Sequence, residues 1–158
     1  MKLTHTFCLL LFSFLLLNSK CKKDNEPQLP PETTTGAMTF GCKIDGKVFL
    51  PKGGDGYPGI IIEYPYLGNG PGGGWFLNIA TRDRSASSSR PGVSITTDSL
   101  LLLEGNTYQL QIQKGSASGE YFLGIYSYKI KPSDNGSLFI TKHDQTQRIL
   151  SGRFSFTA

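Results

Sequence analysis

The chain has 158 residues and a formal net charge of +4, with 38% hydrophobic and 18% charged residues. This length is enough for one domain with a single hydrophobic core. Nucleic-acid binding needs basic residues clustered on one face, whereas the longest basic grouping here is Lys22-Lys23. The composition therefore argues against a nucleic-acid-binding protein.

Residues 1–20 have the layout of a secretory signal peptide. Lys2 is the only charged residue before an apolar run of eleven residues, 7–17, which Ser13 alone interrupts. A helix of that length reaches about 16 Å, well short of the ~30 Å hydrocarbon core of a bilayer. We therefore expect a signal segment and not a permanent transmembrane helix.

A single cysteine, Cys21, stands at the end of the apolar run, directly before a charged stretch. This arrangement resembles a bacterial lipoprotein signal, which implies cleavage before Cys21 and acylation of its sulfur and its new amino group. Several acyl chains would hold a soluble domain stably at a membrane. The usual pattern has Leu three residues before the cysteine and a small residue directly before it, whereas Leu17 lies four residues before and Lys20 directly before. The alternative is a signal that is cut inefficiently.

Residues 21–36 are expected to be the lipidated cysteine and a disordered tether. They contain Pro27, Pro30 and Pro31, and prolines favour an extended chain of about 3.1 Å per residue. The lysines followed by acids after Cys21 resemble the tethers of surface-exposed lipoproteins of the Bacteroidota. That resemblance implies an anchor in the outer membrane with display at the cell surface, and the alternative is an anchor that faces the periplasm.

Residues 37–158 are expected to form one domain that begins with a β-hairpin. Apolar and other residues alternate from Phe40 to Ile44, and Asp45-Gly46 predicts a two-residue turn. In this register Cys42 lies opposite Phe49 on the inward face. A buried, unreactive thiol is expected there and not a nucleophile or a metal ligand.

The rest of the domain also has a β pattern. Residues 98–104 are interpreted as a strand or one loose turn. Many short strands separated by turns predict an all-β domain, either an antiparallel sandwich or a barrel-like sheet. The expected strands cover residues 60–64, 75–81, 93–97, 107–113, 120–130, 137–142 and 149–158.

Two segments, TFGCKIDGKVF at 39–49 and SGRFSFTA at 151–158, resemble the opening and near-final strands of a family of uncharacterised small β-rich lipoproteins of the Bacteroidota. The resemblance implies a fold and a place in the cell envelope, but no activity. Similar chains continue past the Phe-Thr-Ala strand, which leads to the expectation that a final edge strand is missing here.

Catalytic and metal-binding patterns are weak. His143 stands next to Asp144, but neighbours on a strand point to opposite faces, so we expect a solvated turn residue and no catalytic triad. One free cysteine and one histidine are too few for structural zinc, and the acids lack the spacing of a calcium loop. No metal and no cofactor are expected, although calcium in a loop stays an open alternative.

The segment Gly68-Asn69-Gly70-Pro71-Gly72-Gly73 matches G-x-G-x-x-G, but a strand and not a helix is expected after it, which indicates a flexible loop. Aromatic side chains on loops can stack on sugars. The alternative is that Trp75 points into the core with Leu77 and Ile79. The candidate ligand-binding residues flank this loop and are Tyr57, Tyr64, Tyr66 and Trp75.

Together these patterns predict a lipid-anchored, non-catalytic binding or accessory module of the cell envelope, with a glycan or a protein as its ligand. The alternative is a structural subunit that assembles through sheet edges, as fimbrillin-like surface proteins do. An enzyme such as a glycan hydrolase ranks third, because it would need two carboxylates ~5–9 Å apart in a cleft.

Overall fold

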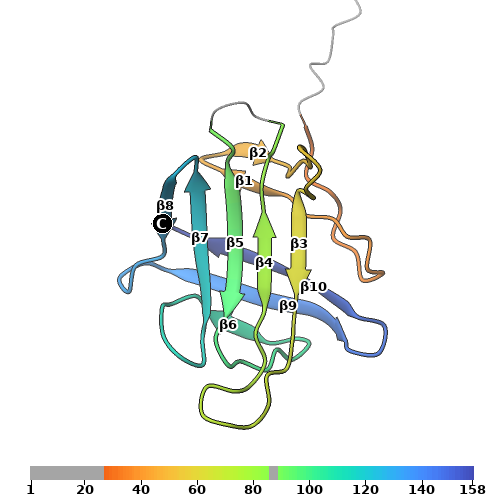
Figure 1. The fold of residues 1–158 in the computed structure, drawn as a ribbon, viewed down its shortest axis with the longest axis vertical. Coiled ribbons are helices and arrows are strands. Elements are labelled where there is room, and N and C mark those ends of the chain that lie inside the picture. The colour runs from red at the N-terminus through yellow and green to blue at the C-terminus, as the bar shows by residue number, and fades with distance from the viewer. Residues whose placement is uncertain (1–26, 86–88) are drawn as a thin grey trace, which may run out of the picture.

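The computed structural model describes residues 27–85 and 89–158, and all regular structure in this part of the chain is β. Three antiparallel sheets form, with strand orders β1-β2, β10-β9-β6 and β3-β4-β5-β7-β8, and each sheet stays open (Figure 1). The expected all-β fold is confirmed, as a sandwich and not as a barrel-like sheet. The strands are β1 Cys42–Ile44, β2 Lys47–Phe49, β3 Ile60–Glu63, β4 Asn78–Thr81, β5 Gly92–Thr97, β6 Thr107–Gln109, β7 Ala117–Leu123, β8 Tyr126–Lys129, β9 Gly136–Asp144 and β10 Ile149–Phe156.

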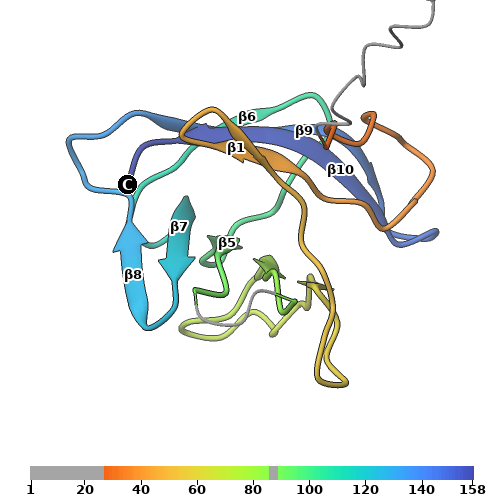
Figure 2. The same cartoon turned by 90° about the horizontal axis from the view of Figure 1, so that it is seen from above.

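The two larger sheets face each other, and the core lies between them (Figure 2). At one place the sheets approach closely because Gly119 on β7 has no side chain. A Cβ built on Gly119 would lie 2.7 Å from the ring of Phe156 on β10, so the glycine makes room for this aromatic side chain. The buried core residues are Leu77, Ile95, Leu102, Leu110, Ala117, Ile130, Leu138 and Ile140.

The first hairpin forms as the sequence predicts. Cys42 pairs with Phe49 across β1 and β2, and Phe49 is buried. Asp45 and Gly46 both have positive φ angles, 49° and 80°, which is the conformation of the tight turn that Asp-Gly favours.

Two of the expected strands are wrong in extent. The strand predicted over 120–130 is a hairpin, β7 and β8, that turns at Gly124 with a φ of 64°. The strand predicted over 107–113 ends at Gln109, and Ile112 beyond it is 58% exposed. The Ser116 hydroxyl lies 2.8 Å from the Gln111 carbonyl oxygen and also contacts that of Gln113, which bends the chain away from the sheet.

The segment expected to be a strand or a loose turn, 98–104, has no regular strand. It nevertheless alternates, because Leu102 is fully buried in the core while Leu101 and Leu103 are exposed. This segment connects β5 of the five-stranded sheet to β6 of the three-stranded sheet.

Residues 32 and 36, which the sequence places in a disordered tether, lie against β10. The Glu32 carboxylate is 3.5 Å from Arg153 Nε, and Gly36 lies beside Ile149. The signal segment and Cys21 lie outside the described residues. In the described part of the chain, no helix is long and apolar enough to cross a membrane.

Candidate binding site

Three of the four predicted aromatic residues come together where β3 ends and β4 begins. The Trp75 ring stacks on the Tyr64 ring with their centroids 5.0 Å apart, and the Tyr66 ring lies 5.2 Å away on a tilted plane. A bridge between Tyr66 and Trp75 and a hydrogen bond from Phe76 N to Pro65 O (3.0 Å) extend the β3–β4 hairpin and fix this arrangement.

The Tyr64 side chain is committed to the fold. Its hydroxyl oxygen accepts a hydrogen bond from Leu102 N at 2.7 Å and donates one to Leu100 O at 3.1 Å. Burial raises the pKa of the Tyr64 phenol. The hydrogen bond from Leu102 lowers this pKa, but its effect is smaller than that of burial. Tyr64 therefore holds the 98–104 segment in place, and Tyr66, at 46% exposed, presents most of the free ring surface.

The fourth predicted aromatic residue, Tyr57, lies at the opposite end of β3 and is not part of this cluster. Its ring is 63% exposed, and the guanidinium carbon of Arg84 lies 5.1 Å from its centroid. The expected platform of four rings is thus two separate features at the two ends of one strand.

His143 is not a solvated turn residue, as expected from sequence, but lies half-buried on β9. Its ring meets the edge of Tyr64 with the centroids 5.3 Å apart, and Nδ1 lies 2.7 Å from Leu102 O. A carbonyl can only accept, so Nδ1 carries the proton. The Asp144 carboxylate accepts a hydrogen bond from Gln147 N at 2.9 Å, within the loop between β9 and β10. The ring thus serves as a packing contact between β9 and the 98–104 segment.

The glycine-rich loop is the tip of the β3–β4 hairpin. The sequence predicts strands on both sides of this loop, and the structure has them. Leu67 N bonds to Gly74 O at 2.8 Å, and Gly73 N bonds to Gly70 O at 2.8 Å. The Ser99 hydroxyl donates to Gly73 O and ties this loop to the segment after β5. A strand follows the loop, so its amides are not arranged at the start of a helix, where a phosphate would bind.

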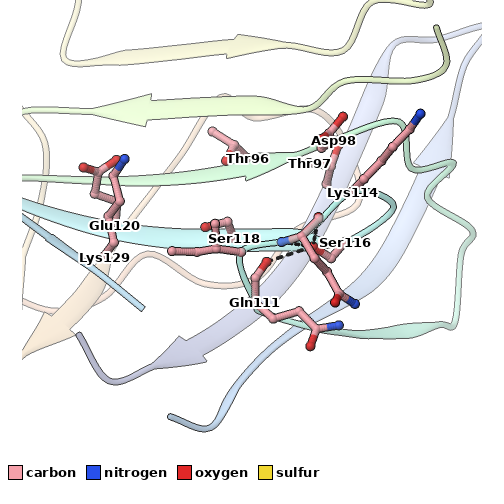
Figure 3. Close-up of a pocket in the computed structure, with 11 residues that line it drawn as sticks. Thr96, Thr97, Asp98, Gln111, Lys114, Ser116, Ser118, Glu120 and Lys129 are labelled. Atoms are coloured by element: carbon pink, nitrogen blue, oxygen red, sulfur yellow. Dashed lines mark hydrogen bonds between the residues drawn. The ribbon is translucent and has the colours of Figure 1, made fainter. Parts of the chain in front are cut away.

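A hollow of about 340 Å³, here called the groove, opens on the outer face of the five-stranded sheet (Figure 3). This volume lies within the range of sites that bind small ligands, roughly 300–1,000 Å³. The sequence did not predict this site. All of its lining residues except Ile112 have polar or charged side chains, and they are Thr96, Thr97, Asp98, Gln111, Ile112, Gln113, Lys114, Ser116, Ser118, Glu120 and Lys129.

Strand register places the floor of the groove. Thr96 pairs with Ser118 and Glu120 pairs with Lys129, so these four side chains lie on one face across β5, β7 and β8. The bend that Ser116 stabilises carries Gln111 to one side of this floor (Figure 3). The groove therefore exists because the strand from residue 107 stops early.

The two acids of the groove are far apart. Glu120 pairs with Ser94, and Asp98 lies four residues further along the β5 direction, about 13 Å away at strand spacing. Glu120 also accepts a hydrogen bond from the Ser127 hydroxyl on β8. Glycoside hydrolysis uses two carboxylates that face each other across a cleft, and strand register does not make these two acids cross-strand neighbours.

The Cys42 thiol is half-buried on β1, and burial raises its pKa to about 11. A thiol with this pKa is protonated near neutral pH and is a poor nucleophile. Within residues 27–85 and 89–158, no three His, Cys, Asp or Glu side chains are grouped closely enough to hold a metal ion.

A scan of the chain against protein-family models gave no match, and searches of curated proteins and of solved structures gave none either.

Proposed function

We propose that this protein is a lipid-anchored, non-catalytic binding module of the bacterial cell envelope, and that the groove holds a glycan. The observation that carries the proposal is the lining of the groove, which combines hydroxyl, amide, carboxylate and ammonium groups on one face. Sugar hydroxyls both donate and accept hydrogen bonds, so they need partners of both kinds. Thr96, Ser118 and Gln111 supply both, Glu120 accepts and Lys129 donates.

The wide separation of Asp98 and Glu120 supports binding without hydrolysis. The half-buried Cys42 and the packed ring of His143 are likewise poorly placed to act on a ligand in the groove. The ligand is therefore held and not cleaved.

The direction of the anchor supports the same role. Glu32 and Gly36 contact β10, so the chain approaches the domain from the side of the three-stranded sheet (Figure 2). The groove lies on the outer face of the other sheet. A domain tethered through Cys21 would thus be held from the face opposite the groove, which leaves the groove open to a ligand.

Anchoring and display rest on the sequence around Cys21 and have their own test. Palmitate labelling of the wild type and of Cys21→Ala should label only the wild type. Equal labelling of both proteins would refute the acylation of Cys21. Protease added to intact cells should degrade the domain if it is displayed on the outer membrane surface. A periplasm-facing anchor, the alternative, would protect it until the outer membrane is opened.

Glycan binding is tested on an array with the full-length protein and a double variant, Thr96→Val with Ser118→Ala, which removes two floor hydroxyls without changing charge. Each lost hydrogen bond is worth about 1 kcal/mol, so we expect affinity to fall roughly tenfold or more. The matched control is Ser137→Ala with Ser155→Ala, whose hydroxyls lie 3.4 Å apart on β9 and β10. Equal binding by both double variants would refute the groove as the site.

A second function, assembly through sheet edges, is favoured by one observation. Edge strand β8 is exposed along all four residues and carries Tyr126 and Tyr128. However, β8 is short and also carries Lys129, and both features discourage pairing with another strand. Sedimentation of the full-length protein in detergent distinguishes the two functions, because ordered multimers would favour assembly and a monomer would favour binding alone.

A further inference from the structure

A second hollow, here called the arginine pocket, lies on the same outer face as the groove, at the end where β3 begins and β4 ends. Its volume is about 210 Å³. Arg82 and Arg84 both line it, no acidic side chain does, and Asn78, Ser94 and Phe122 complete much of its wall. Two arginines that line one hollow without a lining acid favour the binding of an anion.

Arg82 is held across the sheet. Its backbone N bonds to Gly59 O at 2.9 Å, and its guanidinium carbon lies 5.1 Å from the centroid of the Phe122 ring on β7. Gly92 on β5 lies between them, and a Cβ there would be 3.0 Å from Arg82 Cγ and 2.3 Å from Thr81 O. Because Gly92 has no side chain, the Arg82 side chain has room to extend past it to the pocket.

Arg84 is held from the other side. Its backbone N bonds to Lys52 O at 2.9 Å, its Nε donates to Pro58 O at 3.1 Å, and its guanidinium lies over the Tyr57 ring. Nε–H is one of five N–H donors on the guanidinium. The side chain is thus positioned in advance, which lowers the entropy cost of binding a ligand.

The acids near this pocket have partners. Asp55 pairs with Arg90 at 2.9 Å, and Asp83 accepts hydrogen bonds from the Ser85 backbone N and hydroxyl at 3.0 and 2.6 Å. On the outer face of β3, Glu63 bonds to Asn78 Nδ2 at 3.2 Å. Glu63 itself does not line the pocket, and its partner Asn78 is the part of the lining that lies four residues from Arg82, about 13 Å along the strand.

The arginine pocket adjoins the groove. Ser94 lines the pocket and pairs with Glu120, which lines the groove, and Asn78 of the pocket pairs with Thr96 of the groove. Along β5 the two hollows together cover about 20 Å of the outer face. One extended ligand can therefore occupy both.

We propose that the arginine pocket binds the carboxylate or sulfate groups of the glycan that fills the groove, so that the ligand is an acidic polysaccharide. The inference rests on the proposed function and names the class of its ligand. Planar guanidinium groups match oxyanions with paired hydrogen bonds, whereas the neutral polar groups of the groove match the sugar hydroxyls beside them.

The test is calorimetric titration of the purified full-length protein in detergent with three oligosaccharides of equal length: a neutral one, a uronate and a sulfated one. Arg82→Gln and Arg84→Gln should each weaken acidic-ligand binding tenfold or more and leave neutral-ligand binding within twofold. Arg84→Lys, which keeps the charge but loses the fork, should weaken it to an intermediate degree. The control is Arg148→Gln, which removes an arginine charge from the loop between β9 and β10, away from the pocket, and it should change binding less than twofold.

The outcomes separate this inference from the proposed function. If neutral and acidic oligosaccharides bind the groove equally, or if Arg148→Gln weakens binding as much as Arg84→Gln, the acidic assignment is overturned and the glycan module stands. If acidic ligands need Arg82 and Arg84 but ignore Thr96→Val with Ser118→Ala, the pocket is supported and the groove is overturned. If no oligosaccharide binds, both fail. Comparison of the uronate with the sulfated ligand shows which oxyanion the pocket takes.

Discussion

At the scale of single residues, side chains that the sequence marks as chemical have structural roles. Tyr64 bridges two backbone groups of the 98–104 segment, and His143 bonds to Leu102 O from β9. These roles depend on contacts between residues more than thirty positions apart. These structural roles indicate that the aromatic cluster at the β3–β4 hairpin supports the fold, and that the outer face of the five-stranded sheet is the better candidate for binding.

We expect Tyr64→Phe to lower the free energy of unfolding by about 1–3 kcal/mol, because the N–H of the buried residue Leu102 loses its acceptor. Chemical denaturation measures this change. The control is Tyr66→Phe. Tyr66 is 46% exposed, so the stability of this variant should stay within about 0.5 kcal/mol of the wild type. Equal effects of the two substitutions would contradict the bridging role of Tyr64.

The Cys42 thiol should react slowly. With its pKa raised to about 11, the thiolate fraction at pH 8 is roughly a hundredfold lower than that of a thiol of pKa 9. Alkylation of the native full-length protein, followed at the Cys42 peptide by mass spectrometry, should therefore be slow and should accelerate in denaturant. A native rate equal to the denatured rate would show that the thiol is not protected.

The sequence predicts part of the candidate site at this scale. Tyr64, Tyr66 and Trp75 are close in sequence to one hairpin loop, so their clustering follows from a local pattern. Tyr57 is further from this loop in sequence, and the length of β3 separates it from the other three rings. Thr96, Ser118 and Lys129 meet only through strand pairing, and their residue types are common on any exposed strand, so no local signal marks them.

At the scale of elements, patterns with local causes are predicted well. The Asp45-Gly46 hairpin and its register are confirmed, because the two positive φ angles are intrinsic to that turn. The turn at Gly124 was missed because the flanking residues read as one continuous strand. The early end of β6 was also missed, since it depends on a hydrogen bond from Ser116 back to residues before it.

The 98–104 segment ends in a polar contact that should make stability pH-dependent. Glu104 Oε2 accepts a hydrogen bond from His143 N at 3.2 Å and lies 3.3 Å from Lys142 Nζ. The His143 N–H first, and Lys142 second, lower the pKa of Glu104. A lowered pKa in the fold means that this carboxylate stabilises the protein above its ordinary pKa and that the contribution is lost as the pH falls through the lowered value.

We therefore expect Glu104→Gln to destabilise the protein at pH 7 and to have a smaller effect at pH 3. Denaturation of the wild type and the variant at both pH values measures the difference. A loss of the same size at both pH values would mean that the charge of Glu104 contributes nothing.

At the scale of the whole molecule, the two faces of the sandwich differ. The three-stranded sheet receives residues 32 and 36 of the tether, whereas the outer face of the five-stranded sheet carries the groove and the arginine pocket. The sequence predicts an anchored β-domain, but it does not predict which face is free. That assignment depends on how the chain crosses between sheets.

The most direct measurement is the mapping of amide resonances of the isotope-labelled full-length protein during titration with an oligosaccharide that binds on the array. The account predicts that perturbed amides follow β5, β7 and β8 and the bend beside them, including Thr96, Gln111, Ser118 and Lys129. Perturbations confined to β10, or to the hairpin loop around Tyr66, would contradict binding at the groove.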